Sequence, residues 1–263
     1  MKTLIKYLEI YKQFVTTSTA QELSFRVNFC LIVLIDLVFM LTTFFTVDFL
    51  FDHVTQIGPW DRNQLLFYVA FMLTLDNIHT GMVTANFWML SFNIKYGQMD
   101  YIFLKPVSTI FNSFFRYFRP SSVIGLFPST GILIYYGIQC ELTTLSWALI
   151  PLMLFLSLSL FVLIEFILAS AMFWITEGNG VNFVRMSLQQ IARWPEFVYS
   201  GIARKTLLVA IPILLIGSAP VSFLFDLKDY RLLLGMFAAM IVLSVILKFV
   251  WTKAMNQYES ASS

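Results

Sequence analysis

Residues 147–174 read WALIPLMLFLSLSLFVLIEFILASAMFW, and Glu165 is the only charged side chain among them. A helix of about 20 consecutive apolar residues is long enough to cross the hydrocarbon core of a bilayer, which is roughly 30 Å thick. The run therefore predicts a transmembrane helix over about Trp147 to Trp174.

The rest of the chain repeats this pattern. Of its 263 residues, 59% are hydrophobic and only 12% are charged, and the mean hydropathy is +0.78. A soluble domain carries about 25% charged residues. We therefore predict an all-α, polytopic membrane protein with about six transmembrane helices. The other predicted spans are about 27–51, 64–90, 120–138, 206–225 and 232–251.

The ends of the chain differ from this transmembrane domain, which we place at residues 25–254. In residues 1–24, apolar residues recur at helical spacing opposite polar ones, as in Leu4, Leu8 and Tyr11. This pattern is typical of an amphipathic helix that lies on a membrane surface. Residues 255–263 are predicted to be a short polar tail.

An even number of spans places both termini on one side, and the basic residues indicate which side. Cytoplasmic loops are enriched in Lys and Arg. If both termini are cytoplasmic, the inner segments hold all but three of the 17 basic residues, provided that the long amphipathic stretch 175–205 is also inside. The exceptions are Arg62, Lys228 and Arg231. We therefore predict cytoplasmic N- and C-termini.

Motifs for catalysis are absent from the sequence. There is no G-x-x-x-x-G-K-[ST] phosphate loop and no H-E-x-x-H motif, and Cys30 and Cys140 have no metal or redox spacing. We predict that the chain is not an enzyme and carries no catalytic residue, metal or cofactor of its own.

Ionisable residues fall inside three predicted spans. Asp36 and Asp76 lie near the middle of two adjacent antiparallel spans, His79 follows Asp76 by three residues, and Glu165 interrupts the fourth span. An ionised carboxylate at the centre of a bilayer costs about 2.5–3.5 kcal/mol on insertion scales. Asp36, Asp76 and His79 are therefore candidates for a translocation pathway, one that could favour cationic cargo. Hydrogen bonding between helices is the alternative, and it is the favoured interpretation for Glu165.

The loop between the second and third spans is bounded by helix signals. Gly97 suits a tight turn, Asp100 supports a helix start and Pro106 ends the segment. The sequence predicts a short helix at the cytoplasmic surface. A plain interfacial linker is the alternative.

Two stretches carry a family resemblance. Residues 96–108, YGQMDYIFLKPVS, resemble the R-x-G-x-x-D-x-x-L-x-[KR]-P-x-S signature of a group of ATP-binding-cassette (ABC) exporter permeases, although Tyr96 replaces the usual basic residue. Residues 194–225, WPEFVYSGIARKTLLVAIPILLIGSAPVSFLF, are similar to the P-x-x-[IV]-Y-x-x-x-x-[KR] segment of that group and the apolar run after it. The matching residues, which we interpret as helix-break or gating positions, are Pro195, Tyr199, Arg204, Pro212 and Pro220.

The resemblance implies a function. Such permeases lack an ATPase domain, pair with a second copy or a sister permease, and bind a separate cytoplasmic ATPase that holds ATP and Mg²⁺. We therefore expect an ABC exporter permease in the plasma membrane of a bacterium or archaeon, moving a hydrophobic or amphiphilic solute outward. The expected contacts with the ATPase are Gly97, Asp100, Ile102, Phe103, Leu104, Lys105 and Pro106.

Two other functions remain open at this point. A proton-coupled secondary transporter would use Asp36, Asp76 and His79 as a relay, and a scaffold or assembly factor would transport nothing. Arg116 and Arg119, which follow the predicted short helix, are expected to bind lipid headgroups. No residue fixes the cargo, and no nucleic-acid partner is expected.

Overall fold

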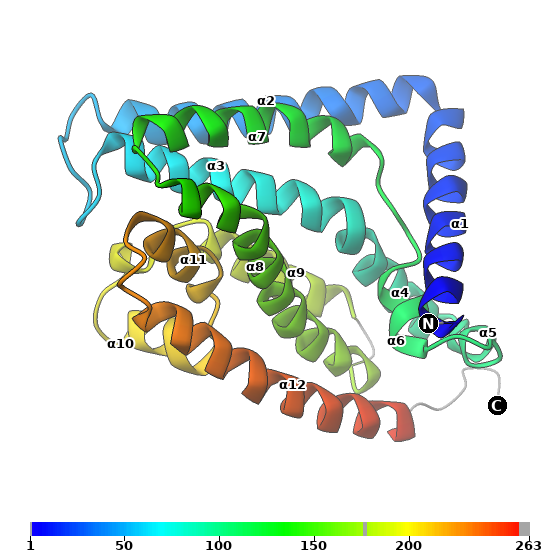
Figure 1. The fold of residues 1–263 in the computed structure, drawn as a ribbon. Coiled ribbons are helices and arrows are strands. Elements are labelled where there is room, and N and C mark those ends of the chain that lie inside the picture. Colours follow the sequence, from blue (N-terminus) through cyan, green and yellow to red (C-terminus); the bar gives the residue numbers. More distant parts are fainter. Residues whose placement is uncertain (1, 176–177, 258–263) are drawn as a thin grey trace.

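The computed structural model describes residues 2–175 and 178–257, and Figure 1 shows them as a bundle of long helices. In this part of the chain, five helical stretches are long and apolar enough to cross a membrane, and a sixth candidate is sharply bent. The only β pairing in the described residues is an isolated bridge between Ile57 and Trp60. The prediction of an all-α polytopic membrane protein is confirmed. The elements that make up these five stretches are α2 (Arg26–Leu50), α3 (Arg62–His79) with η1 (Thr80–Thr84) and α4 (Ala85–Lys95), α7 (Ser121–Gln139), α8 (Thr144–Ser170) with η2 (Ala171–Phe173), and α12 (Arg231–Gln257).

The central element is the continuous helical stretch α3–η1–α4. It starts at a capping box, in which Asp61 accepts a hydrogen bond from the Gln64 backbone and the Gln64 side chain accepts one from the Asp61 backbone. The run from Leu65 to Leu75 is buried on every side, as expected of a helix that is apolar all round. By contrast, α2 and α12 leave most of their apolar surface exposed.

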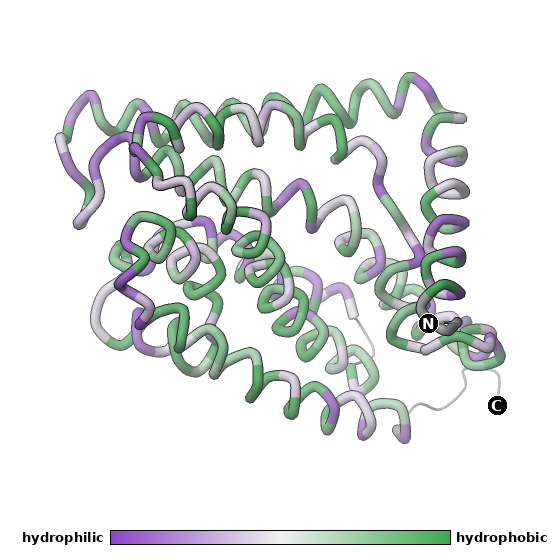
Figure 2. The backbone as a smooth tube through the Cα atoms, viewed as in Figure 1, coloured by the Kyte–Doolittle hydropathy of each residue, from purple (hydrophilic) through white to green (hydrophobic). Residues whose placement is uncertain are grey.

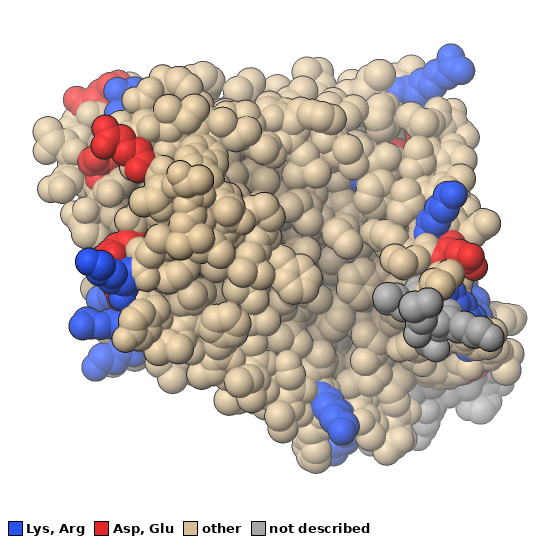
Figure 3. Space-filling view, in the orientation of Figure 1, with Lys and Arg blue, Asp and Glu red and all other residues tan. Residues whose placement is uncertain are grey.

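Charge and hydropathy divide the molecule into an apolar, uncharged band and two charged ends. Figure 2 shows apolar residues along the long helices and hydrophilic residues in the loop between α2 and α3. In the space-filling view of Figure 3, most charged side chains lie at the two ends of the bundle, with an uncharged surface between them. This band is what a hydrocarbon core requires.

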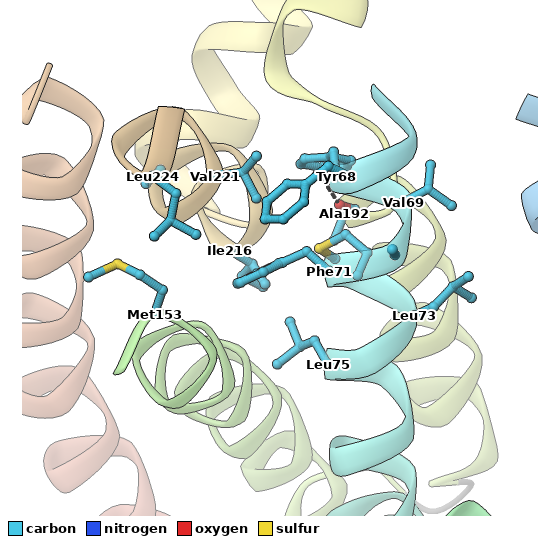
Figure 4. Close-up of a cluster of buried hydrophobic side chains, with 14 of the residues drawn as sticks. Tyr68, Val69, Phe71, Leu73, Leu75, Met153, Ala192, Ile216, Val221 and Leu224 are labelled. Carbon is cyan, nitrogen blue, oxygen red and sulfur yellow. Dashed lines mark hydrogen bonds between the residues drawn. The ribbon is translucent and has the colours of Figure 1, made fainter. Parts of the chain in front are cut away.

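The structure corrects the placement of residues 175–205. We predicted a segment on the inner surface, but α9 (Asn179–Ala192) runs antiparallel to α3 through the bundle. At its start, Ser91 Oγ of α4 lies 2.5 Å from where a Cβ on Gly178 would be. At its end, Tyr68 Oη donates a 3.0 Å hydrogen bond to the Ala192 carbonyl (Figure 4). α9 therefore crosses from the end that holds the chain termini to the opposite end.

The predicted continuous span 206–225 is also wrong. Its helices form a pair bent by 91°, with the break between Ala210 and Leu215. The first arm enters from the end where α9 finishes, and the second arm returns there, since Ser146 at the start of α8 donates to the Leu224 carbonyl. We call this segment the re-entrant hairpin. It consists of α10 (Gly201–Lys205), η4 (Thr206–Ala210) and α11 (Leu215–Phe225), and it is preceded by the short η3 (Glu196–Val198).

These two corrections offset one another. α9 runs along the bundle from one end to the other, and the two arms of the re-entrant hairpin begin and end at the same end, so α12 still returns the chain to the end where it began. Arg204 and Lys205, which we placed at the end of the termini, lie at the opposite end.

Two hydrophobic clusters hold the bundle together. The larger joins α3 to α2, α7, α8, α11 and α12, and Figure 4 shows part of it around Phe71, Met153, Ile216 and Leu224. The smaller, which we call the terminal cluster, lies at the end of the chain termini. It joins α4 to α5 (Met99–Phe103), α6 (Thr109–Phe114), α8, α9 and α12.

The N-terminal helix α1 (Lys2–Ser24) crosses the direction of the spans at this same end (Figure 1). This orientation accords with a helix in the plane of the membrane surface. The predicted polar tail, residues 255–263, lies outside the described residues from residue 258 onward.

The crossing by α9 predicts a labelling pattern. The background chain carries Cys30→Ser and Cys140→Ser. In this background, a thiol reagent on one side of the membrane should label both Thr55→Cys and Ile202→Cys, and a reagent on the other side should label Ser108→Cys. Ile202 is highly exposed, so access does not limit its reaction. With cytoplasmic termini, an impermeant thiol reagent added outside intact cells labels positions 55 and 202. Labelling of position 202 together with 108 would contradict the crossing.

Candidate functional site

Asp76, a predicted pathway residue, is held by the end of α9. Its carboxylate accepts hydrogen bonds from Arg193 at 2.9 and 3.0 Å and from Gln189 at 3.2 Å. Arg193 also lies over the ring of Phe39 of α2, at 4.9 Å. The acid therefore sits in a junction of three helices, α2, α3 and α9, and its charge is compensated.

Asp36 of α2 has a cationic partner of its own. Arg119, just before α7, donates a 2.7 Å hydrogen bond to its carboxylate. The Arg119 backbone N–H donates to the carbonyl of Gly81 in η1, which fixes the position of the side chain. Arg119 is therefore engaged within the bundle, and its predicted role in binding lipid headgroups is corrected.

One cavity unites these two ion pairs. It has a volume of about 180 Å³ and is lined by Asp36, Asp76, Arg119 and Arg193. A neighbouring cavity of about 370 Å³ shares Asp76 and Arg193 with it and extends along a row of hydroxyls on α2, namely Thr42, Thr43 and Thr46. The expectation that Asp36 and Asp76 lie at similar depth agrees with this geometry. Since two arginines balance the two acids, the lining gives no electrostatic reason to favour cationic cargo.

His79 does not join this cavity. It is fully buried, and its Nε2 lies 2.5 Å from Oε2 of Glu165 on α8. Oε1 of Glu165 accepts a 2.8 Å hydrogen bond from Arg185 of α9. We call His79, Glu165 and Arg185 the buried triad. Its acid sits between two possible cations, so the interpretation of Glu165 as an interhelical hydrogen-bonding residue fits this geometry.

The surroundings of the buried triad are aromatic. The His79 ring stacks on Phe161 with centroids 4.4 Å apart, and the Arg185 guanidinium lies 4.7 Å from the ring centroid of Phe87. Two nitrogens of Arg185 and both polar atoms of the Asn182 amide have no hydrogen-bond partner among the described residues. Breaking a buried pair of this kind leaves an uncompensated charge and is strongly destabilising.

The π-helical turn η1 lies between the ion-paired cavity and the buried triad. Its Thr84 hydroxyl is 3.2 Å from Nδ1 of His79, and its Gly81 carbonyl binds the Arg119 backbone. π turns inside α-helices weaken the regular backbone ladder and occur frequently at functional sites. This turn gives the α3–η1–α4 stretch a defined place to bend.

The predicted contact segment for the ATPase forms the short helix α5. Gly97 has a φ of +66°, the left-handed conformation that favours glycine at a turn. Tyr101 and Leu104 are 71% and 82% exposed, and Phe103 is 41% exposed. Ile102 is only 3% exposed and packs in the terminal cluster, so its side chain faces the bundle rather than solvent.

The second motif forms the turn between α9 and the re-entrant hairpin. Pro195 precedes η3, and Tyr199 Oη donates a 2.9 Å hydrogen bond back to the Ile191 carbonyl. Arg204 pairs with Glu196. Pro212 lies in the break of the hairpin, and Pro220 lies inside α11.

A comparison with protein-family models decides the family. The model described as ABC-2 family transporter protein matches residues 37–262, which is most of the chain. The chain belongs to this family. No curated protein and no solved structure matches it.

Members of the ABC-2 family are membrane transport proteins, so the chain is a multi-pass transport protein with a permease role. This agrees with the resemblance in residues 96–108 and 194–225. Among the described residues, no group of three or more His, Cys, Asp or Glu side chains is arranged to hold a metal ion.

The buried triad predicts non-additive stability effects. Glu165→Gln leaves Arg185 without a counter-ion, and Arg185→Met leaves Glu165 with His79 alone, so each should lower the free energy of unfolding by about 3–5 kcal/mol. The double variant should recover most of this loss, because it removes both charges. The measurement is denaturant unfolding of the purified protein in mild detergent.

Arg204→Met is the matched control, since it breaks an exposed ion pair with Glu196 and should cost no more than about 1 kcal/mol. A double variant whose loss equals the sum of the two single losses would contradict the pairing.

Proposed function

We propose that this chain is the permease subunit of an ABC exporter, which moves a hydrophobic or amphiphilic solute outward across the plasma membrane. ATP and Mg²⁺ are bound and hydrolysed by a separate cytoplasmic ATPase. Membership of the ABC-2 family supports a transport subunit, and the observation that carries the proposal further is the seating of α5.

α5 has one face for a partner and one face for the bundle. Tyr101 and Leu104 present apolar surface to solvent, whereas Met99 and Ile102 are buried in the terminal cluster. Packed interiors are dense and transmit displacement rather than absorb it. A force applied to α5 therefore reaches the helices that meet in this cluster.

The path from α5 into the membrane is continuous. Phe87 and Leu90 of α4 belong to the terminal cluster, and α4 continues through η1 into α3. α3 carries Asp76, which is bound to Arg193 of α9. Movement of α5 would thus bend the chain at η1 and shift α3 against α9 and α2, beside the two cavities.

The lining of the cavities supports an amphiphilic cargo. The cavity of about 370 Å³ combines apolar walls, such as Val47 and Met72, with three threonine hydroxyls and one balanced ion pair. Pockets of about 300–1,000 Å³ with a few polar groups on an apolar wall are typical of small-molecule sites. We propose that the transported solute passes along α2, α3 and α9, and that it has an apolar body and little net charge.

A second permease copy, or a sister permease, is the other proposed partner. α2 and α12 each expose an apolar face along most of a span, for example at Leu34, Phe45, Val245 and Phe249. One of these faces can pack on the second copy while the other faces lipid.

The geometry gives less support to a proton relay. Asp36 and Asp76 are each paired with an arginine, and His79 is bound to Glu165. A relay requires groups that exchange protons with one another, whereas these three have separate partners. Transport that stops on ATP depletion, but continues when an uncoupler removes the proton gradient, would separate the two functions.

Truncation of the α5 surface should uncouple the proposed complex. Leu104→Ser and Phe103→Ala remove exposed apolar groups, and anchors at interfaces are worth about 2 kcal/mol or more, which corresponds to roughly 30-fold in affinity. The measurement is ATP-dependent solute uptake into inside-out vesicles, together with the ATPase activity that co-purifies with the tagged chain. Both should fall, while the amount of folded permease stays constant.

Two controls make this test specific. Tyr135→Ala removes an exposed aromatic side chain from α7 and should change neither readout. Ile102→Ala should lower the stability of the permease by about 2–5 kcal/mol, because it opens a cavity in the terminal cluster. Normal ATPase association and transport in Leu104→Ser and Phe103→Ala would show that α5 is only a linker.

A further inference from the structure

A cavity of about 440 Å³ separates α1 from the segment that connects α5 to α7. Three hydrogen bonds along its length fix α1 over this cavity. Lys6 Nζ donates to the Pro106 carbonyl at 3.1 Å, Tyr7 Oη accepts from the Ser108 backbone at 2.9 Å, and Ser18 Oγ accepts from the Phe118 backbone at 3.3 Å. The cavity is therefore enclosed between α1 and the segment that connects α5 to α7, and hydrogen bonds hold these two walls together.

The cavity is cationic on one side. Lys105 and Arg116 both line it, and no acidic side chain lines it among residues 2–175 and 178–257. Within the same described residues, neither cation pairs with a carboxylate; Arg116 instead lies 5.4 Å from the ring centroid of Tyr117. Burial, followed by the charge of Arg116, lowers the pKa of Lys105. An anion between the two cations would relieve this repulsion.

Asn112 points to the same ligand chemistry. Its side chain is 2% exposed and lines the cavity, and its Nδ2 has no hydrogen-bond acceptor among the described residues. A buried donor without an acceptor is costly to keep. An oxygen-rich anion in the cavity would supply this acceptor.

The other wall of the cavity is amphipathic. Ile10 and Phe14 of α1 and Val107 give it apolar surface, and α1 also contributes uncharged polar side chains, namely Gln13, Thr17, Ser18 and Gln21. A small hydrophilic anion gains nothing from the apolar side chains of this wall, whereas the acyl part of a lipid does. Basic pockets at the cytoplasmic side of membrane proteins bind anionic headgroups, and α1 has the orientation of a helix in the interfacial plane.

We propose that this cavity binds one anionic phospholipid, with its phosphodiester between Lys105 and Arg116 and within reach of Asn112 Nδ2, and with its apolar part against Ile10, Phe14 and Val107. The lipid joins α1 to the segment that carries α5. The site needs neither an ATPase nor a cargo, so it stands apart from the proposed transport function.

Lipid titration of the purified chain tests the proposal. After delipidation in a neutral detergent, the melting temperature is followed while phosphatidylglycerol, phosphatidylcholine or inorganic phosphate is added, and native mass spectrometry counts the bound lipids. We expect phosphatidylglycerol to bind with a stoichiometry of one and to raise the melting temperature, while phosphatidylcholine has little effect. Equal effects of the two lipids would overturn the proposal, and an equal effect of inorganic phosphate would overturn its lipid source.

The variants separate this site from general charge attraction. The double variant Lys105→Gln/Arg116→Gln should weaken phosphatidylglycerol binding at least about tenfold, because it removes two charge-assisted contacts. The matched control Lys248→Gln/Lys253→Gln removes two exposed cations from α12 at the same end of the bundle. It should change binding less than twofold. Similar losses in both double variants would overturn the proposal.

Asn112→Leu provides a test that does not depend on charge. Since the side chain has no acceptor among the described residues, this substitution should not destabilise the lipid-free protein. It should nevertheless reduce the rise in melting temperature caused by phosphatidylglycerol. An unchanged rise in this variant would contradict the proposed contact.

Discussion

The pairing of Arg185 with Glu165 is the interaction on which the arrangement of this bundle depends. Arg185 is 1% exposed and lies among Phe87 and other apolar side chains of a membrane-spanning domain. A guanidinium there is tolerated only with a counter-ion, because the loss of its hydration is not repaid by apolar contacts. Glu165 supplies this counter-ion from α8, and His79 holds the second oxygen of the same carboxylate. The polar face of α9 is thereby satisfied inside the bundle, and the helix crosses.

The crossing of α9 in turn organises both halves of the molecule. Arg185, Gln189 and Arg193 occupy successive turns of one helix face, and they bind Glu165 on α8 and Asp76 on α3. Through these contacts α9 connects the terminal cluster, where α5 is seated, to the cavities beside α2. It also ends where the re-entrant hairpin begins, so the motif around Pro195 and Tyr199 lies at the end of the bundle opposite α5.

The apolar spans could be predicted from local hydropathy. The position of α9 and the bend in the hairpin could not, because they depend on contacts between residues distant in the chain. Runs such as 147–174 were located correctly because α8 and its neighbours are uniformly apolar. α9 was misplaced because its charged residues are neutralised by partners distant in the chain, which no local window reveals. The hairpin was predicted as one span, since an apolar run that bends at residues 211–214 has the same composition as a straight one.

The candidate site also has features that the sequence predicted and features that it did not. Gly97 and Pro106 correctly marked a short helix, but a helix of five residues is too short for periodicity to fix its phase, and so the burial of Ile102 could not be predicted. Asp36 and Asp76 were correctly placed near each other from their depth, whereas their partners, Arg119 and Arg193, lay outside the predicted spans. Glu165 and His79 could have been linked only by the rule that a buried acid needs a partner.

The most direct test of this account is whether α9 reaches the end of the bundle opposite the chain termini. Phe197 packs edge-on against Trp60 there, with ring centroids 4.9 Å apart. In a chain without other cysteines, a short bifunctional thiol reagent should cross-link Trp60→Cys to Phe197→Cys, and it should leave Ser108→Cys with Phe197→Cys unlinked. Cross-linking of position 197 to 108, and not to 60, would show that α9 lies on the surface beside the termini and would contradict the role given to Arg185.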